Sequence, residues 1–193
     1  MDSPLVYIEK EPFEQILLAA VDPFKKECFG YIFGKKPSRT SNEYLVSKIQ
    51  VVQRVKVEKF TEIEHMEGSK KRMFDIFRAY PNIYPLIGDF HSHPEYGSDQ
   101  RSFELSDHDI KDMSISSWCE IAFVIRISSR SKERLEWISK SDGGVRGSYG
   151  DYVIDINVYR LIKKGGKLVP ESLQITSPGI KSLNRENNRR KKR

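Results

Sequence analysis

The segment GDFHSHPEYGSDQRSFELSDHDI, residues 88–110, concentrates side chains that could bind a metal. It holds three of the four histidines of the chain and six acidic residues. His91 and His93 stand two positions apart, and residues i and i+2 of a strand project from the same face. Neutral imidazole is a preferred zinc ligand, and a catalytic zinc takes three protein ligands and a water. The pair therefore predicts a zinc site whose third ligand is a nearby carboxylate or imidazole.

Candidates for that third ligand follow in the sequence SDHD, residues 106–109. Ser106-x-x-Asp109 ahead of an apolar residue is also the pattern of a helix capping box, so these residues have a structural alternative. His108 is expected to face solvent at the start of the helix. Asp89, two residues before His91, is either a polar rim residue or an orienting partner of a ligand.

The elements that must position these residues follow from hydrophobic periodicity. Helices are predicted over residues 11–20, within 65–82 ahead of Pro81, and from Ser106 onward. Pro94 is expected to end the strand of the histidine pair. Strands are predicted within residues 27–36, 44–60, 84–93, 118–128, 133–141 and 150–162, with 118–128 and 133–141 a candidate hairpin. The sum is an α/β (α+β) domain with a mixed sheet and helices on its faces.

The order of three motifs resembles the JAMM/MPN+ zinc metalloprotease family. Its H-x-H-P pattern matches HSHP, its S-x-x-D pattern matches Ser106 and Asp109, and its upstream glutamate matches Glu27 in ECFGYIFG. The resemblance covers roughly residues 5–160. It implies an MPN-type three-layer domain over residues 1–168, with a central mixed sheet flanked by helices. Residues 169–193 are expected to form an extended arm and a disordered basic tail.

The spacer after His93 departs from the family pattern, because twelve residues precede Ser106 where seven are usual. The usual spacing would put Arg101 in the place of the serine and Glu104 in the place of the aspartate. Arginine cannot replace the serine, so Ser106 and Asp109 after a five-residue insertion are preferred. Glu104 remains the reserve third ligand, since loops tolerate insertions at modest cost.

The resemblance implies zinc-dependent hydrolysis of an amide. His91, His93 and Asp109 would hold Zn²⁺, Glu27 would be the general base, and Ser106 would donate a hydrogen bond to the oxyanion. The implied substrates are conjugates of ubiquitin or a ubiquitin-like modifier. Alternatives are a JAMM-type hydrolase of another small carrier protein or peptide, and a non-catalytic MPN scaffold subunit of a larger complex. Scaffold members typically lack the ligands, which argues against the last alternative.

Composition narrows the class of protein. The 193 residues carry a net charge of +6, of which the last nine residues supply +5, so the remaining chain is nearly neutral. A nucleic-acid-binding function through this tail is therefore less favoured than a solvated end. No apolar run reaches the length of a membrane helix, and no secretory signal pattern begins the chain. Cys28 and Cys119 lie in apolar segments, which favours buried thiols and a cytoplasmic location.

Overall fold

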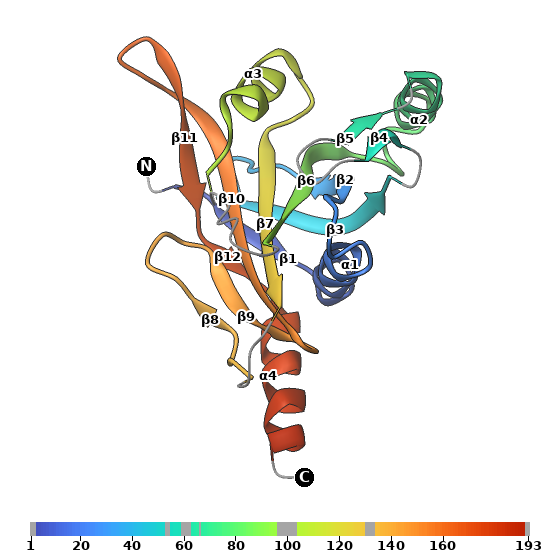
Figure 1. Cartoon of the computed structure of the whole chain (residues 1–193). Coiled ribbons are helices and arrows are strands. Elements are labelled where there is room, and N and C mark those ends of the chain that lie inside the picture. Colours follow the sequence, from blue (N-terminus) through green and yellow to red (C-terminus); the bar gives the residue numbers. More distant parts are fainter. Residues whose placement is uncertain are drawn as a thin grey trace.

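The computed structural model describes residues 3–52, 55–58, 63–65, 67–95, 104–129 and 134–191. In these residues the chain forms a ten-stranded mixed sheet, a separate two-stranded sheet and four helices (Figure 1). The elements are β1 (Leu5–Ile8), α1 (Lys10–Val21), β2 (Phe29–Lys35), β3 (Glu43–Val51), β4 (Val55–Glu58), β5 (Ile63–His65), α2 (Glu67–Ala79), β6 (Leu86–Glu95), α3 (Asp107–Ile115), β7 (Ile121–Ser129), β8 (Ile138–Ser139), β9 (Val145–Tyr149), β10 (Tyr152–Lys164), β11 (Lys167–Leu173), β12 (Ile175–Thr176) and α4 (Pro178–Lys191).

The large sheet nearly closes into a barrel. Its strand order is β12-β1-β3-β2-β6-β7-β10-β9-β8, and β11 pairs with β10 beside this path. Leu173 of β11 pairs with Val158 of β10, whereas Ile175 of β12 pairs with Val6 of β1. One residue separates β11 from β12, so a single stretch of chain joins two strands that lie far apart in the order. This return brings the ends of the sheet together.

The predicted three-layer MPN-type domain, a sheet flanked by helices, is wrong. The described residues hold four helices against ten strands of one sheet, and the strands curve round toward closure. The physical reason is the C-terminal third of the chain. There β10, a strand of 13 residues, pairs with β7, β9 and β11, so strands extend the sheet where helical layers were expected.

Strand β6 separates an apolar face of the sheet from a polar one. Gly88, Phe90, Ser92 and Pro94 are buried, while the residues between them are partly exposed. The buried set is level with Ile121, Phe123, Ile125 and Ile127 of β7, which belong to the main hydrophobic core together with α1. Asp89, His91 and His93 lie on the opposite face. Alternation along one strand therefore places the histidine pair away from the core.

Helices α2 and α3 each cover part of this polar face. Phe77 of α2 packs with Tyr31 and Phe33 of β2, and Met113 of α3 packs with Val124 and Tyr159. Helix α3 lies with the β10–β11 hairpin at one end of the molecule, and α4 projects from the opposite end (Figure 1).

Several local predictions are confirmed, and others are wrong. The helix expected over residues 11–20 is α1, and the strand expected within 84–93 is β6. Pro94 does not end β6, which continues to Glu95 with Pro94 level with Ile127. The candidate hairpin is not formed, because β7 pairs with β10 and β8 pairs with β9.

The expected extended, disordered C-terminal segment also differs from the structure. Residues up to 191 form β11, β12 and α4. Asn184 bonds both the backbone nitrogen and the carbonyl of Trp137, and Asn187 donates to the carbonyl of Ser148, so α4 is anchored. The segment is ordered by strand pairing and by the hydrogen bonds of its amide side chains, although its sequence has no sustained hydrophobic period. The proposed domain division at residue 168 stays a prediction. No helix in the described ranges is long and apolar enough to cross a membrane.

Candidate functional site

Helix α3 begins beside β6 and brings Asp109 to His91. Ser106 is the N-cap, and its hydroxyl accepts a hydrogen bond from the Asp109 backbone nitrogen at 3.2 Å. The Asp109 carboxylate in turn accepts bonds from the Ser106 nitrogen at 2.8 Å and the Ser106 hydroxyl at 2.7 Å. This is a complete capping box, which fixes the carboxylate at the first turn of the helix. Asp109 Oδ2 lies 3.8 Å from His91 Nε2.

The Nε2 atom of His91 is buried and has no hydrogen-bond partner among the residues that the structure describes. Burial is the main cause that lowers the pKa of His91 to about 4, so the ring is neutral at neutral pH. Burial opposes ionisation of Asp109 as well, yet the neighbouring His91 and the bonds from Ser106 lower the pKa of this carboxyl. A neutral imidazole nitrogen therefore points toward a carboxylate at a distance too long for a hydrogen bond.

His93 lies on the same face of the sheet as His91, and Glu27 lies just before the neighbouring strand β2. The ring centroids of His91 and His93 lie 4.9 Å apart. Phe29 of β2 is level with His91, and Cys28 exchanges hydrogen bonds with Ser92 at 2.8 and 3.0 Å. Glu27 is half-buried and lies just before β2, whose pairing with β6 begins at Phe29. It is therefore two residues from the strand position that is level with His91.

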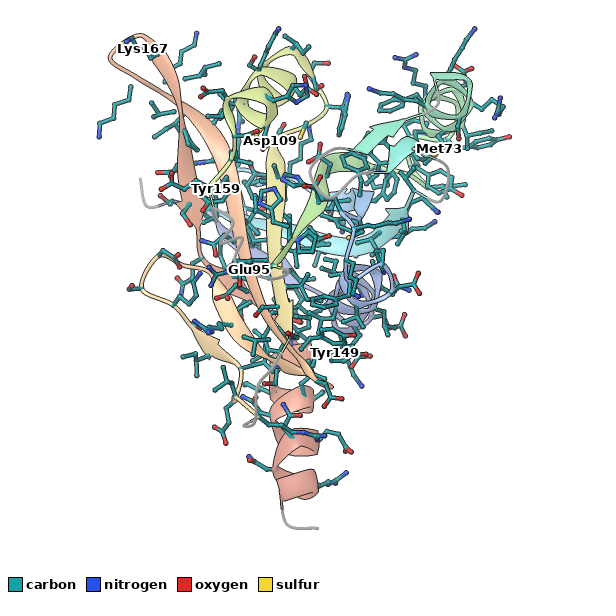
Figure 2. The ribbon with its side chains drawn as sticks, viewed as in Figure 1. Met73, Glu95, Asp109, Tyr149, Tyr159 and Lys167 are labelled. Atoms are coloured by element: carbon teal, nitrogen blue, oxygen red, sulfur yellow. The ribbon has the colours of Figure 1, made fainter. Side chains whose placement is uncertain are left out.

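A cavity of about 60 Å³ lies against His91 and Asp109. Phe29, Asp89, Asp112, Met113 and Ala122 complete its lining. Burial raises the pKa of Asp89 to about 7, and the Cys119 thiol lies 3.5 Å from its carboxyl group. The volume is suited to a water molecule or a single ion rather than an organic ligand. Figure 2 shows Asp109 at the α3 end of this face, with Glu95 farther along β6.

Sequence reasoning missed Asp112 and left the role of Asp89 open. Asp112 follows Asp109 by three residues, which is the helical spacing of side chains on one face, so the signal was present in the sequence. His108 is exposed, as expected, with its ring 3.7 Å from the Asp112 carboxylate. Glu104 is exposed ahead of α3. Arg101 lies outside the described residues.

The described part of the chain contains no cluster of three His, Cys, Asp or Glu side chains already arranged to hold a metal ion. His91 and Asp109 lie 3.8 Å apart, and His93 lies on the same face of β6. Ser106, expected to donate a hydrogen bond to an oxyanion, gives its hydroxyl hydrogen to Asp109. The capping-box alternative is therefore realised in the structure. The zinc site itself stays a prediction.

Comparison with known proteins identifies no family. No family model matches the chain, and no curated protein matches it. A solved structure that is similar in shape is protein DSY2949 from Desulfitobacterium hafniense, at 14% identity and a TM-score of 0.47. The similarity covers 90% of this chain and 92% of that chain. At this TM-score it supports no inference about fold or function.

The predicted membership of the JAMM/MPN+ family is wrong. No family model supports it, the sheet nearly closes where a helix-flanked layer was expected, and the described residues form no ready three-ligand cluster. Short motifs misled here because Ser-x-x-Asp is also a capping box, and that is the structure it forms. What remains is the local geometry of His91, His93, Asp109 and Glu27, which has to be judged by its own chemistry.

Proposed function

We propose that this chain binds one zinc ion through His91, His93 and Asp109 and hydrolyses amide bonds. The observation that carries the proposal is the buried, unbonded Nε2 of His91 with the Asp109 carboxylate 3.8 Å away. A buried polar atom without a partner costs free energy and calls for a functional explanation. A cation shared by the two groups would satisfy both.

The separation of the two groups supports this interpretation. Zinc–nitrogen and zinc–oxygen bonds are about 2.0–2.2 Å long, so two tetrahedral ligands of one ion lie about 3.4 Å apart. The observed 3.8 Å is close to that value and beyond hydrogen-bond range. Because the described residues form no ready three-ligand cluster, His93 has to rotate toward the other two. Its position on the same face of β6, with rings 4.9 Å apart, allows this.

The remaining residues suit the chemistry of hydrolysis. When bound, zinc supplies an activated water and polarises a carbonyl group. Glu27, two residues before the β2 residue that is level with His91, would accept a proton as general base and return it to the leaving amine. Ser106 orients Asp109 through the capping box, and its predicted hydrogen bond to an oxyanion requires the hydroxyl to leave that carboxylate. The amide at the C-terminus of a ubiquitin-like modifier is the first substrate to test.

Zinc content decides the first half of the proposal. We expect the purified chain, stripped with a chelator and titrated with zinc against a chromophoric competitor, to bind about one ion. His91→Ala, His93→Ala and Asp109→Ala should each abolish this binding. Glu104→Gln is the matched control, because this exposed carboxylate precedes the same helix and should leave binding unchanged. Zinc retained by Asp109→Ala but lost in Glu104→Gln would refute the assigned ligand set.

Glu27→Gln decides the second half. The amide keeps the shape of the side chain and removes its basicity, so we expect normal zinc binding and an unchanged melting temperature. Turnover of a ubiquitin-like conjugate or of a generic peptide amide should fall about 10²- to 10⁴-fold. Wild-type cleavage by this variant would refute the mechanism. Zinc binding without cleavage in the wild-type chain would reduce the site to a structural metal centre.

A further inference from the structure

A second cavity lies away from the histidine pair, at the start of β6. Its volume is about 490 Å³, within the range of small-molecule binding sites. It is enclosed by the last two turns of α2, the segment that follows this helix, the end of β2 and the turn before β7. The lining residues that matter below are Lys36, Phe74, Phe77, Arg78, Tyr84 and Trp118. None of these residues lines the cavity beside His91.

Aromatic side chains in the cavity lining pack against one another. The Phe77 ring packs edge-on against Phe33, with ring centroids 4.9 Å apart, and lies tilted against Tyr84 at 5.5 Å. Trp118 packs against Phe74 at 5.4 Å. Rings locked in this way by their neighbours offer a preformed apolar surface, which lowers the entropic cost of binding a flat or aliphatic group.

The rim of the cavity is cationic. The Arg78 guanidinium, which lines the cavity, lies over the Phe74 ring at 5.9 Å. Lys48 does not line the cavity, but its ammonium lies over the lining residue Tyr84 at 4.2 Å. Neither cation has an ion pair within the described ranges of the chain. Lys36 contacts Glu120 at 2.6 Å, so one of the two cations that line the cavity is neutralised. Arg78 is the lining cation that remains for an anion.

We propose that the cavity binds a small organic anion with an aromatic body, such as an arylcarboxylate. The rings of Phe77, Tyr84 and Trp118 receive the apolar body, and Arg78 pairs with the anionic group at the rim. Arginine suits this task because its planar fork binds a carboxylate through two parallel hydrogen bonds. The proposal is independent of zinc, since it rests on residues outside the histidine site.

Two fluorescent probes distinguish the contribution of the anionic group to binding from that of the apolar rings. Anilinonaphthalene sulfonate carries an anionic group, and phenylnaphthylamine has the same ring system without it. We expect the anionic probe to bind the folded chain at about one molecule per chain and the neutral probe to bind more weakly. In amide correlation spectra, the indole N–H of Trp118 and the backbone amide of Ser117 should shift on binding.

Arg78→Gln should weaken the anionic probe about fivefold and leave the neutral probe within about twofold, as expected for a partly exposed charge pair. Arg78→Lys should restore part of the affinity. Lys71→Gln is the matched control, because it removes the same charge from an exposed position of α2 outside the cavity. Melting curves exclude unfolding as the cause of any loss.

Several results would overturn the proposal. Equal affinity of the two probes, or equal losses in Arg78→Gln and Lys71→Gln, would show that charge at the rim does not matter. Shifts confined to residues near His91 would place the ligand in the other site. Binding of many probe molecules per chain without a shift of Trp118 would indicate nonspecific adsorption.

Discussion

Asp155 with its neighbouring cations and His91 with Asp109 are two polar groups on the same face of the sheet, and they differ in how their charges are balanced. Arg126 is level with His93 in β7, and Asp155 of β10 is level with Arg126. Asp155 lies within 4 Å of three cations, Arg126 at 3.2 Å, Lys140 at 3.6 Å and Arg146 at 3.8 Å. Its side chain is only 4% exposed, so this carboxylate is buried among opposite charges.

His91 is in a different position. Within the described ranges its Nε2 atom has no hydrogen bond, and the Asp109 carboxylate lies 3.8 Å from it. Asp155 Oδ1 also lacks a hydrogen bond, but it has the Lys140 ammonium beside it. The charge of Asp155 is balanced by cations of the same chain, whereas His91 and Asp109 are suited to share a cation from solution. We therefore expect Asp155 to contribute mainly to folding stability and His91 mainly to metal binding.

The largest effect is expected from Asp155→Asn. Arg126 keeps Glu95 at 3.1 Å and Lys140 keeps Asp142 at 3.2 Å, so the loss is that of the buried charged bonds to Asp155 and should cost about 1.5–3 kcal/mol of unfolding free energy. Urea denaturation measures this loss. Asp75→Asn, an exposed position of α2, should stay within about 0.5 kcal/mol. A loss below about 1 kcal/mol for Asp155→Asn would remove the contrast between the groups.

The opposite pattern is expected for His91→Leu. Zinc affinity should fall by at least about 100-fold, or about 2.7 kcal/mol, because a ligand is removed. The metal-free unfolding free energy should change by less than about 1 kcal/mol, since no hydrogen bond of Nε2 is lost. Competition titration and urea denaturation report the two quantities. A stability loss above about 2 kcal/mol would make His91 a structural residue.

A smaller effect is expected from Ser106→Ala. Losing the cap hydroxyl should destabilise the chain by about 1 kcal/mol and, by freeing the Asp109 carboxylate, weaken zinc about tenfold. Ser114→Ala is the control on the same helix, because its hydroxyl bonds only the carbonyl of Lys111. The link between the cap and the metal fails if both variants bind zinc like the wild type.

The smallest effect should be a pH dependence at Asp142, beside the Asp155 group. Burial opposes its ionisation, but bonds from Asn157, Gly144 and Lys140 hold the pKa of Asp142 below 3.8. A lowered folded-state pKa stabilises the chain above the unfolded value, and this contribution is lost as pH falls through the folded value. Asp142→Asn should therefore be less stable than wild type at neutral pH, and the two should converge well below pH 3.8. Equal stability at neutral pH would contradict this.

Local patterns in the sequence were sufficient for much of the secondary structure. Apolar residues at helical spacing predicted α1, and the aromatic run before Gly34 predicted β2. The His91-x-His93 spacing predicted a common face, and Ser106-x-x-Asp109 predicted the capping box that the helix uses. These succeeded because each depends on residues only a few positions apart.

Pairings between distant segments could not be predicted in this way. No local pattern marks residues 167–176 as the stretch that joins β10 to β1, because strand partners are chosen by packing and register over long separations. The family assignment failed for a related reason. Ser106-x-x-Asp109 fits both a metalloprotease motif and a helix capping box, and the four residues alone do not distinguish the two.

Short-range patterns were enough to predict which side chains share a face of β6 and that a helix begins at Ser106, with a capping box to Asp109 as one of two interpretations. The packing of the whole chain places His91 Nε2 in a buried position with no hydrogen bond among the described residues, brings Asp109 to it, and surrounds Asp155 with cations. The physical reason is that alternation and capping are short-range backbone effects. Burial and charge compensation depend on which strands become neighbours, and that is settled by the whole sheet.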